Sequence, residues 1–170
     1  MPVIIIPAQS SDLPEIYRLF EQAIQFQREK NYIGWNNYDK EFIREDISNQ
    51  LLYRIIKGKD TLGIFSVCYS DPLIWREKEK SDALYLHRIV LNREFREIKL
   101  FRLLLDWALV HASEKKLKHL RMDTWAENEK LINYYRSYGF RFIEEYTTAN
   151  TEELPVQHRN LKVALLELIV

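Results

Sequence analysis

A short basic cluster stands where a predicted strand runs into a predicted helix. The strand is the aromatic and β-branched run Leu84–Leu91, and apolar residues three and four apart then predict a helix over Phe95–Ser113. The first N–H groups of a helix lack partners and its dipole repels cations, so basic residues there need another reason to be present. A bound phosphate would be such a reason for Arg96, Lys99 and Arg102; the alternative is an ordinary turn with solvated basic side chains.

Two side chains of the same predicted strand could move a proton. Tyr85 and His87 are two residues apart and therefore share one face of the strand. Histidine titrates near neutrality, so His87 could accept a proton directly or through water, as could Tyr85. The alternative for His87 is a structural histidine with satisfied hydrogen bonds. The strand carries no carboxylate between Ala83 and Leu91, so the identity of a general base stays open.

The composition sets the protein class that must position these groups. With 170 residues and 46% hydrophobic content, one domain over residues 1–170 is expected. Lys+Arg and Asp+Glu are both 25, so no global field attracts nucleic acid or an anionic membrane. The single cysteine, Cys68, leaves no internal disulfide and no cysteine pair for a metal, so we predict no metal site. Without a signal-like or membrane-spanning run, we expect a cytoplasmic location and no membrane partner.

The order of elements predicts an α+β fold with a mixed, mostly antiparallel sheet. A capping box at Asp12 and Glu15 marks the first helix start, the turn at Gly58 marks a hairpin, and Asp71–Asp82 is expected to be a surface connection. A strand–helix–strand unit at the centre must be parallel and right-handed. We predict seven strands (3–6, 51–57, 61–69, 84–91, 120–124, 140–147, 161–170) and four helices (12–27, 40–48, 95–113, 127–138).

An aromatic loop is predicted between the first two helices. The segment Arg28–Asp39 carries Tyr32, Trp35 and Tyr38 among asparagines and a glycine. Aromatic residues on a loop often line a pocket, although they also serve to cover a core. Trp35 is therefore a candidate for contact with a substrate, with core packing as the alternative.

A second cluster of spaced residues identifies a family resemblance. The passage DTWAENEKLINYYRSYGF, residues 123–140, places an asparagine near a helix start, a tyrosine later in the helix and a terminal Gly-Phe pair. With the strand LHRIV at residues 86–90 and the element order, this spacing resembles the GNAT superfamily of acetyl-CoA-dependent N-acetyltransferases. The resemblance extends over nearly the whole chain.

The resemblance implies a cosubstrate and roles for individual residues. Acetyl-CoA would bind between two parallel strands that splay apart, Tyr85–Leu91 and Leu120–Thr124, and Tyr135 would protonate the departing thiolate. An amine carried by a small molecule or a peptide would be the acceptor, contacted by Trp35, Asp123 and Trp125. The cofactor site would comprise Ile89, Val90, Leu91, Arg96, Glu97, Ile98, Lys99, Leu100, Phe101, Arg102, Asn128 and Tyr135.

The turn before the central helix departs from the family pattern. Arg96 matches the leading arginine of the family's phosphate turn, but Lys99 and Phe101 occupy its two glycine positions. Lys99 would keep its N–H available if its φ is negative, and the Phe101 ring would either enter the core or displace the cofactor. If it displaces the cofactor, the chain would be a GNAT-like binding or regulatory module without catalysis. A homodimer formed through an exposed last strand is also open.

Overall fold

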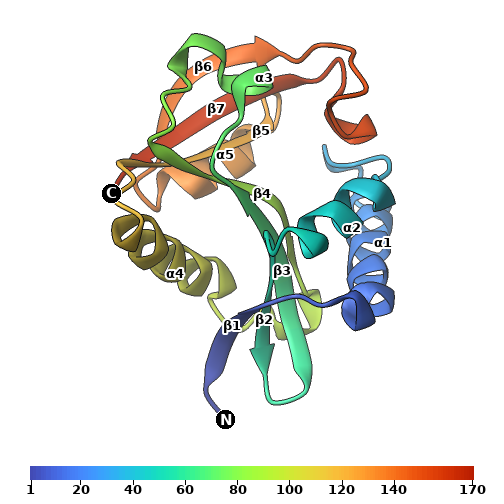
Figure 1. The fold of residues 1–170 in the computed structure, drawn as a ribbon. Helices are drawn as coiled ribbons and strands as arrows, with labels where there is room; N and C mark the ends of the chain where they lie inside the picture. The colour runs from blue at the N-terminus through green and yellow to red at the C-terminus, as the bar shows by residue number, and fades with distance from the viewer.

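The computed structural model describes residues 1–170 as a seven-stranded sheet with five α-helices. The strands are β1 (Val3–Pro7), β2 (Leu52–Lys57), β3 (Asp60–Cys68), β4 (Ala83–Leu91), β5 (His119–Trp125), β6 (Arg141–Thr147) and β7 (Lys162–Ile169). The helices are α1 (Leu13–Glu29), α2 (Lys40–Ser48), α3 (Pro72–Trp75), α4 (Leu100–Glu114) and α5 (Glu129–Arg136). The order in the sheet is β1-β2-β3-β4-β5-β7-β6 (Figure 1), so the predicted α+β fold is confirmed.

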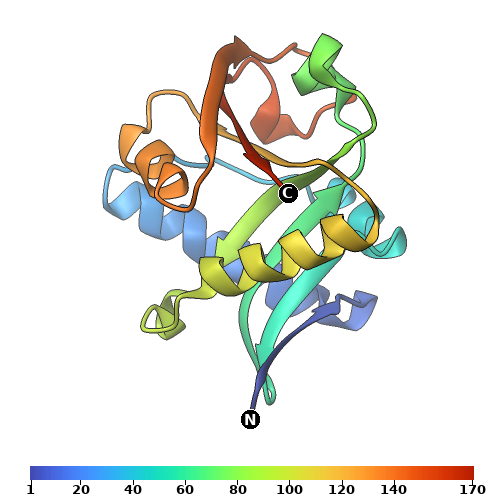
Figure 2. The same cartoon turned by 90° about the vertical axis from the view of Figure 1, so that its left-hand side faces the viewer.

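Helices cover both faces of this sheet. Helices α1 and α2 pack on one face through a core that includes Ile16, Phe20 and Ile43. Helices α4 and α5 pack on the other face, which we call the α4 face (Figure 2); its core includes Leu104 and Phe140. Each buried side chain removes apolar surface from water, at roughly 25 cal/mol per Å². The sheet therefore separates these two cores, and a third buried cluster, around Trp75 and Tyr85, packs under α3.

The only parallel contact in the sheet is short. Strands β4 and β5 pair over three residues, from Ala83 with His119 to Tyr85 with Arg121, while every other pair of strands is antiparallel. Beyond Tyr85, β4 has no strand partner on its β5 side. The predicted parallel strand–helix–strand unit is thus present, and it opens after three pairs of residues.

A β-bulge in β4 accompanies this opening. Ser66 of β3 pairs with His87 and Ile64 pairs with Val90, so two residues of β4 oppose one residue of β3. Arg88, one of the two, has a φ of 51°. A bulge bends its strand and redirects side chains. Here Arg88 reaches α2, where its Nε donates to Asp46 Oδ2 over 3.0 Å.

Two predictions for helix starts were wrong. The helix predicted from Phe95 begins at Leu100, because a 3-10 turn over Arg93–Phe95 precedes it. Asp12 does not cap α1 through Glu15; its carboxylate accepts from Gln9 N and forms an ion pair with Arg54. In the first case, the apolar residues kept a helical spacing through the turn before α4. In the second case, Arg54 of β2 binds the Asp12 carboxylate.

Two further predictions were wrong about what is exposed. The segment predicted as a surface connection contains α3, whose Trp75 is 0% exposed and packs against Tyr85. The last strand is not an edge, because β7 lies between β5 and β6. The edge strand on that side of the sheet is β6, so a homodimer cannot form by pairing of the last strand, β7, as predicted. No helix is both long and apolar enough to span a bilayer.

Candidate active site

A cavity of about 1010 Å³ occupies the opening between β4 and β5. Its wall includes Leu86, Met122 and Tyr135 on the α4 face. His87 follows Leu86 on β4 and Asp123 follows Met122 on β5, so these two lining side chains point to the opposite face of the sheet. A cavity lined from both faces passes through the sheet. Two reactants that enter from opposite sides can therefore meet between the strands.

Tyr135 offers a hydroxyl to this cavity from the α4 face. Helix α5 presents the side chain inward. Asn128 Oδ1 accepts from Leu131 N at the start of the helix, and the helix ends at Arg136, three residues before Gly139 with its φ of 99°. Tyr135 is 9% exposed, and its hydroxyl has no hydrogen-bond partner in the protein. Burial raises the pKa of Tyr135, and the negative charge of Asp123 adds to the effect. The phenol therefore stays protonated and free to donate at neutral pH.

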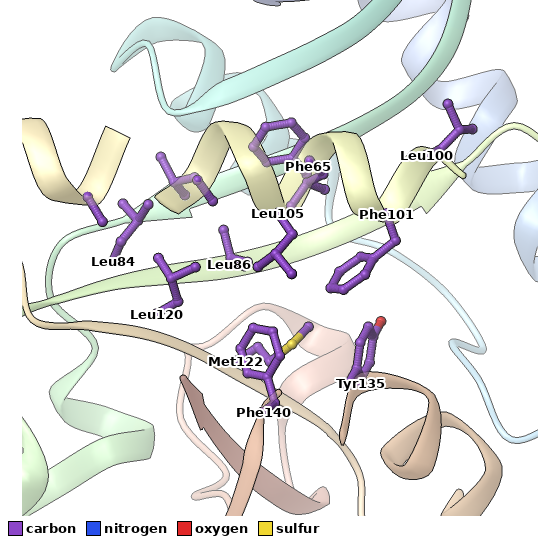
Figure 3. Packing of buried hydrophobic residues seen from close by; sticks show 14 of the residues in the cluster. Phe65, Leu84, Leu86, Leu100, Phe101, Leu105, Leu120, Met122, Tyr135 and Phe140 are labelled. Atoms are coloured by element: carbon purple, nitrogen blue, oxygen red, sulfur yellow. The ribbon is translucent and has the colours of Figure 1, made fainter. Parts of the chain in front are cut away.

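The Phe101 ring lies in the core and not in the turn before α4. It is 1% exposed, and its centroid is 5.0 Å from that of Tyr135 and 4.9 Å from that of Tyr138. Figure 3 shows the Phe101 and Tyr135 rings side by side between α4 and α5. Of the two alternatives for this residue, the structure shows the one in which the ring enters the core.

The turn before α4 presents unpaired backbone donors. The N–H groups of Arg96, Glu97, Lys99 and Phe101 donate to no other group of the protein. Lys99 has a φ of −73°, the negative value that keeps its N–H available without a glycine. These free amides are interrupted by the bonded amides of Ile98 and Leu100, and with the exposed Arg96 side chain nearby they are suited to a phosphate group. The Phe101–Tyr135 contact places this turn beside the cavity.

The other side of the cavity carries an Asp–His–Asp cluster. His87 Nε2 lies 3.3 Å from Asp71 Oδ2, and His87 Nδ1 lies 3.8 Å from Asp123 Oδ1. Asp71 comes from the start of α3 and lies behind the ring, whereas Asp123 on β5 lines the cavity with His87. The imidazole is thus held between two carboxylates.

Burial sets the protonation states of this cluster. Burial alone would lower the pKa of His87, but Cys68 and Asp71 outweigh it and raise the pKa well above its usual value. Burial raises the pKa of Asp123 to about 6, against the opposing charge of His87. Burial lowers the pKa of the nearby His158 to about 3, assisted by the positive charges of His87 and Arg88. At neutral pH the cluster holds a charged His87 and a neutral His158.

The neutral, buried His158 predicts a loss of stability in acid. Its folded pKa of about 3 lies below the value near ~6.5 of an unfolded histidine, so the unfolded chain binds more protons between these values. Stability from this residue is complete above pH ~6.5 and falls by up to about 1.4 kcal/mol per unit as pH drops toward 3. Urea unfolding of the wild type and of His158→Gln across this range should show the difference between them shrinking. A difference that is constant with pH would contradict the assignment.

The other residues predicted for the site lie in two groups. Trp35, Ile89, Val90, Leu91, Trp125 and Asn128 all line the cavity. Tyr85 does not: it is buried, donates to Glu79 Oε2 and accepts from Arg121 Nη1. Burial raises its pKa, and the Glu79 carboxylate contributes. Arg96, Glu97, Ile98, Lys99, Leu100, Phe101 and Arg102 form the adjoining turn and the start of α4, outside the cavity wall.

The aromatic loop after α1 covers the cavity and also packs on the core. The Trp35 ring meets that of Trp125 edge-on at 5.9 Å and that of Phe20 at 5.4 Å. Asn128 Nδ2 donates to Ile33 O over 3.3 Å, which ties the loop to α5. Trp35 therefore packs on the core and also lines the cavity, while its contact with a substrate stays a prediction. The side-chain amide of Asn128 is occupied by the loop and the helix cap.

Two residues of the site, Asp71 and His158, could not be found from the sequence. They lie in polar connections that carry no local signal, and only the tertiary fold brings them to His87. Asp71, His87 and Asp123 offer donor atoms within 4.8 Å of one another, as a metal site would. Because the imidazole separates the two carboxylates, we interpret the cluster as an ion trio.

The fold matches those of known proteins. The chain superposes on a GNAT acetyltransferase from Listeria monocytogenes with a TM-score of 0.79, covering 99% of this chain and 95% of that one at 19% identity. It also matches N-acetylglutamate synthase from Neisseria gonorrhoeae, whose structure holds coenzyme A and N-acetyl-glutamate, with a TM-score of 0.67 at 15% identity. That match covers 99% of this chain and 35% of the synthase. These likenesses establish the fold.

Sequence comparison then establishes the family. Residues 15–140 match the model of the acetyltransferase (GNAT) family. The chain is 23% identical over 147 residues to the uncharacterized N-acetyltransferase YesJ of Bacillus subtilis, covering 81% of each chain. This protein belongs to the GNAT acetyltransferase family.

Proposed function

We propose that this protein transfers an acetyl group from acetyl-CoA to the amine of an acceptor. The observation that carries the proposal is the cavity through the sheet, which joins the Tyr135 hydroxyl on one face to His87 and Asp123 on the other. The free amides before α4 supply a place for the pyrophosphate next to the Tyr135 side of the cavity. Acetyl-CoA enters from the α4 face, and the acceptor enters from the opposite face.

Each proton in the reaction has a destination. The acceptor ammonium first loses a proton to the Asp123 carboxylate, because His87 is already charged, and its nitrogen then attacks the thioester carbonyl carbon. A C–N bond forms, the C–S bond breaks, and Tyr135 gives its proton to the departing thiolate. The nitrogen sheds a second proton as it becomes an amide, and that proton restores Tyr135. One proton is released to solvent per turnover.

Two departures from the family pattern are compatible with this proposal. Phe101 directs its ring into the core, and Lys99 keeps its N–H free at a negative φ. These observations favour a cofactor-binding enzyme over a module that has lost catalysis.

Acetyl-CoA should raise the melting temperature of the protein. At about 100 times Kd, a ligand that binds only the folded state adds about 2.7 kcal/mol, which for this chain length raises Tm by roughly 5–10 °C. Differential scanning fluorimetry at millimolar acetyl-CoA measures the shift. Acetyl-pantetheine, which lacks the pyrophosphate, is the matched control and should give a much smaller shift. No shift with acetyl-CoA would favour the non-catalytic module.

A further inference from the structure

We propose that the acceptor binds as an ammonium ion against Asp123, and that its amine has no carboxylate on the neighbouring carbon. This inference rests on the proposed function and names the acceptor class. The acceptor is thus an organic monoamine or polyamine cation, and not an α-amino acid. Three features of the inner end of the cavity carry the inference: an unpaired buried carboxylate, the absence of a free cation, and an aromatic wall.

The first feature is the unpaired oxygen of Asp123. Its side chain is 6% exposed and lines the cavity, and Oδ1 has no hydrogen-bond partner. Its nearest cationic atom is His87 Nδ1 at 3.8 Å, too distant for a hydrogen bond. A buried carboxylate without a donor is costly, and an ammonium group would supply up to three N–H donors. The ammonium group of the acceptor would therefore satisfy Asp123 Oδ1.

The second feature is the absence of a free cation beside Asp123. Two other cations line the cavity, but Arg93 lies over the Phe26 ring at 3.3 Å and Lys130 lies near the Tyr32 ring at 5.9 Å. Arg88 lines the cavity, but its guanidinium is bound to Asp46 through both Nε and Nη2. His87 is already flanked by Asp71 and Asp123, and His158 is neutral at physiological pH. Two carboxylates against one imidazole leave this end of the cavity negative. An acceptor carboxylate placed there would meet like charge without a partner.

The third feature is the aromatic wall beside Asp123. Trp125 follows it by two residues on β5, and Trp35 meets Trp125 edge-on at 5.9 Å. Phe26 and Tyr32 also line the cavity, but Arg93 and Lys130 of the protein already lie over their rings. Aromatic faces attract organic cations and also cover apolar substituents. The wall suits an amine whose remaining carbon skeleton is apolar or aromatic.

Pairs of amines that differ by one carboxylate test this inference. Tyramine with tyrosine, histamine with histidine, and cadaverine with lysine would each be titrated into the CoA-bound protein by calorimetry and assayed by thiol release with acetyl-CoA. In at least one pair, the decarboxylated member should bind and react with kcat/KM at least 30-fold higher, the scale on which a buried charge is left unpaired. Preference for the amino acids, or no binding of any cationic amine at millimolar concentration, would overturn the inference.

The variant Asp123→Asn separates charge from shape. It should raise KM for the preferred amine by at least 30-fold and reduce the preference within the pair, while the acetyl-CoA shift in Tm persists and reports a folded protein. Asp60→Asn removes a carboxylate from the β2–β3 hairpin, outside the cavity, and should change neither value. An unchanged KM in Asp123→Asn would overturn the inference while leaving the proposed function intact.

A metal ion is the other cation that this cluster could attract. Zn²⁺ would be titrated into the wild type and Asp123→Asn under the same conditions. Zinc that binds only the wild type, together with amines that do not bind, would make the cluster a metal site and overturn the inference. Failure of acetyl-CoA to shift Tm would instead remove the proposed function, and this inference with it.

Discussion

Replacing Tyr135 with phenylalanine should lower kcat by roughly 10²- to 10⁴-fold while changing KM for acetyl-CoA little. The substitution deletes one hydroxyl and keeps the ring that packs on Phe101 and Phe140. The hydroxyl has no partner in the protein, so its loss breaks no hydrogen bond of the fold. The departing thiolate would lose its positioned acid, and the effect would therefore fall on turnover.

The matched control is Tyr138→Phe, two residues beyond the end of α5. Tyr138 contacts Phe101 at 4.9 Å but does not line the cavity, so its hydroxyl has no route to the thiolate. Thiol release with a reactive amine would be measured for the wild type and both variants after their unfolding curves are matched. Wild-type turnover in Tyr135→Phe would remove Tyr135 from the mechanism.

Replacing Phe101 with alanine should cost about 3–5 kcal/mol of unfolding free energy, the range for deleting a buried phenylalanine. The ring is 1% exposed and contacts Tyr134, Tyr135, Tyr138 and Phe140, so no neighbour can close the space without leaving its own contacts. Glycine would cost about 1 kcal/mol more than alanine because it also weakens the start of α4. Denaturant unfolding measures the loss.

The control for this deletion is Phe142→Ala on β6. Phe142 is 46% exposed, so removal of the same atoms should cost far less. If Phe101→Ala cost under about 1 kcal/mol and also tightened acetyl-CoA binding, the ring would occupy the phosphate turn and not the core. That result would contradict the packing described above.

Elements with a strong local pattern could be predicted from the sequence. All seven strands were found because β-branched runs are bounded by turn residues, as at Gly58. Tyr135 and Phe140, which both lie in the core, were identified through the family resemblance, because the asparagine, tyrosine and Gly-Phe spacing coincides with that of the family. The β4 residues Ile89–Leu91, which line the cavity, followed from the same resemblance.

Residues whose role depends on distant partners could not be predicted. The partners of His87 could not be predicted, because Asp71 and Asp123 come to opposite sides of its ring only in the folded chain. Trp75 lay in a charged segment, yet it is buried against Tyr85 because α3 folds over the end of the sheet. The start of α4 was missed because apolar residues kept a helical spacing through a turn where Lys99 leaves the helical region. Tertiary contacts decided each of these cases.

The three-residue ladder between β4 and β5 makes the sheet behave mechanically as four strands joined to three. Beyond Tyr85 the two parts are linked by side chains, since α4 contributes Leu104, Leu105 and Ala108 to a core that touches both β4 and β5. Side-chain packing adjusts to substitution more readily than a backbone ladder does. The distance between the strands is thus controlled from α4, and substitutions in that helix offer a route to altered acceptor tolerance during evolution without any change to the reacting groups.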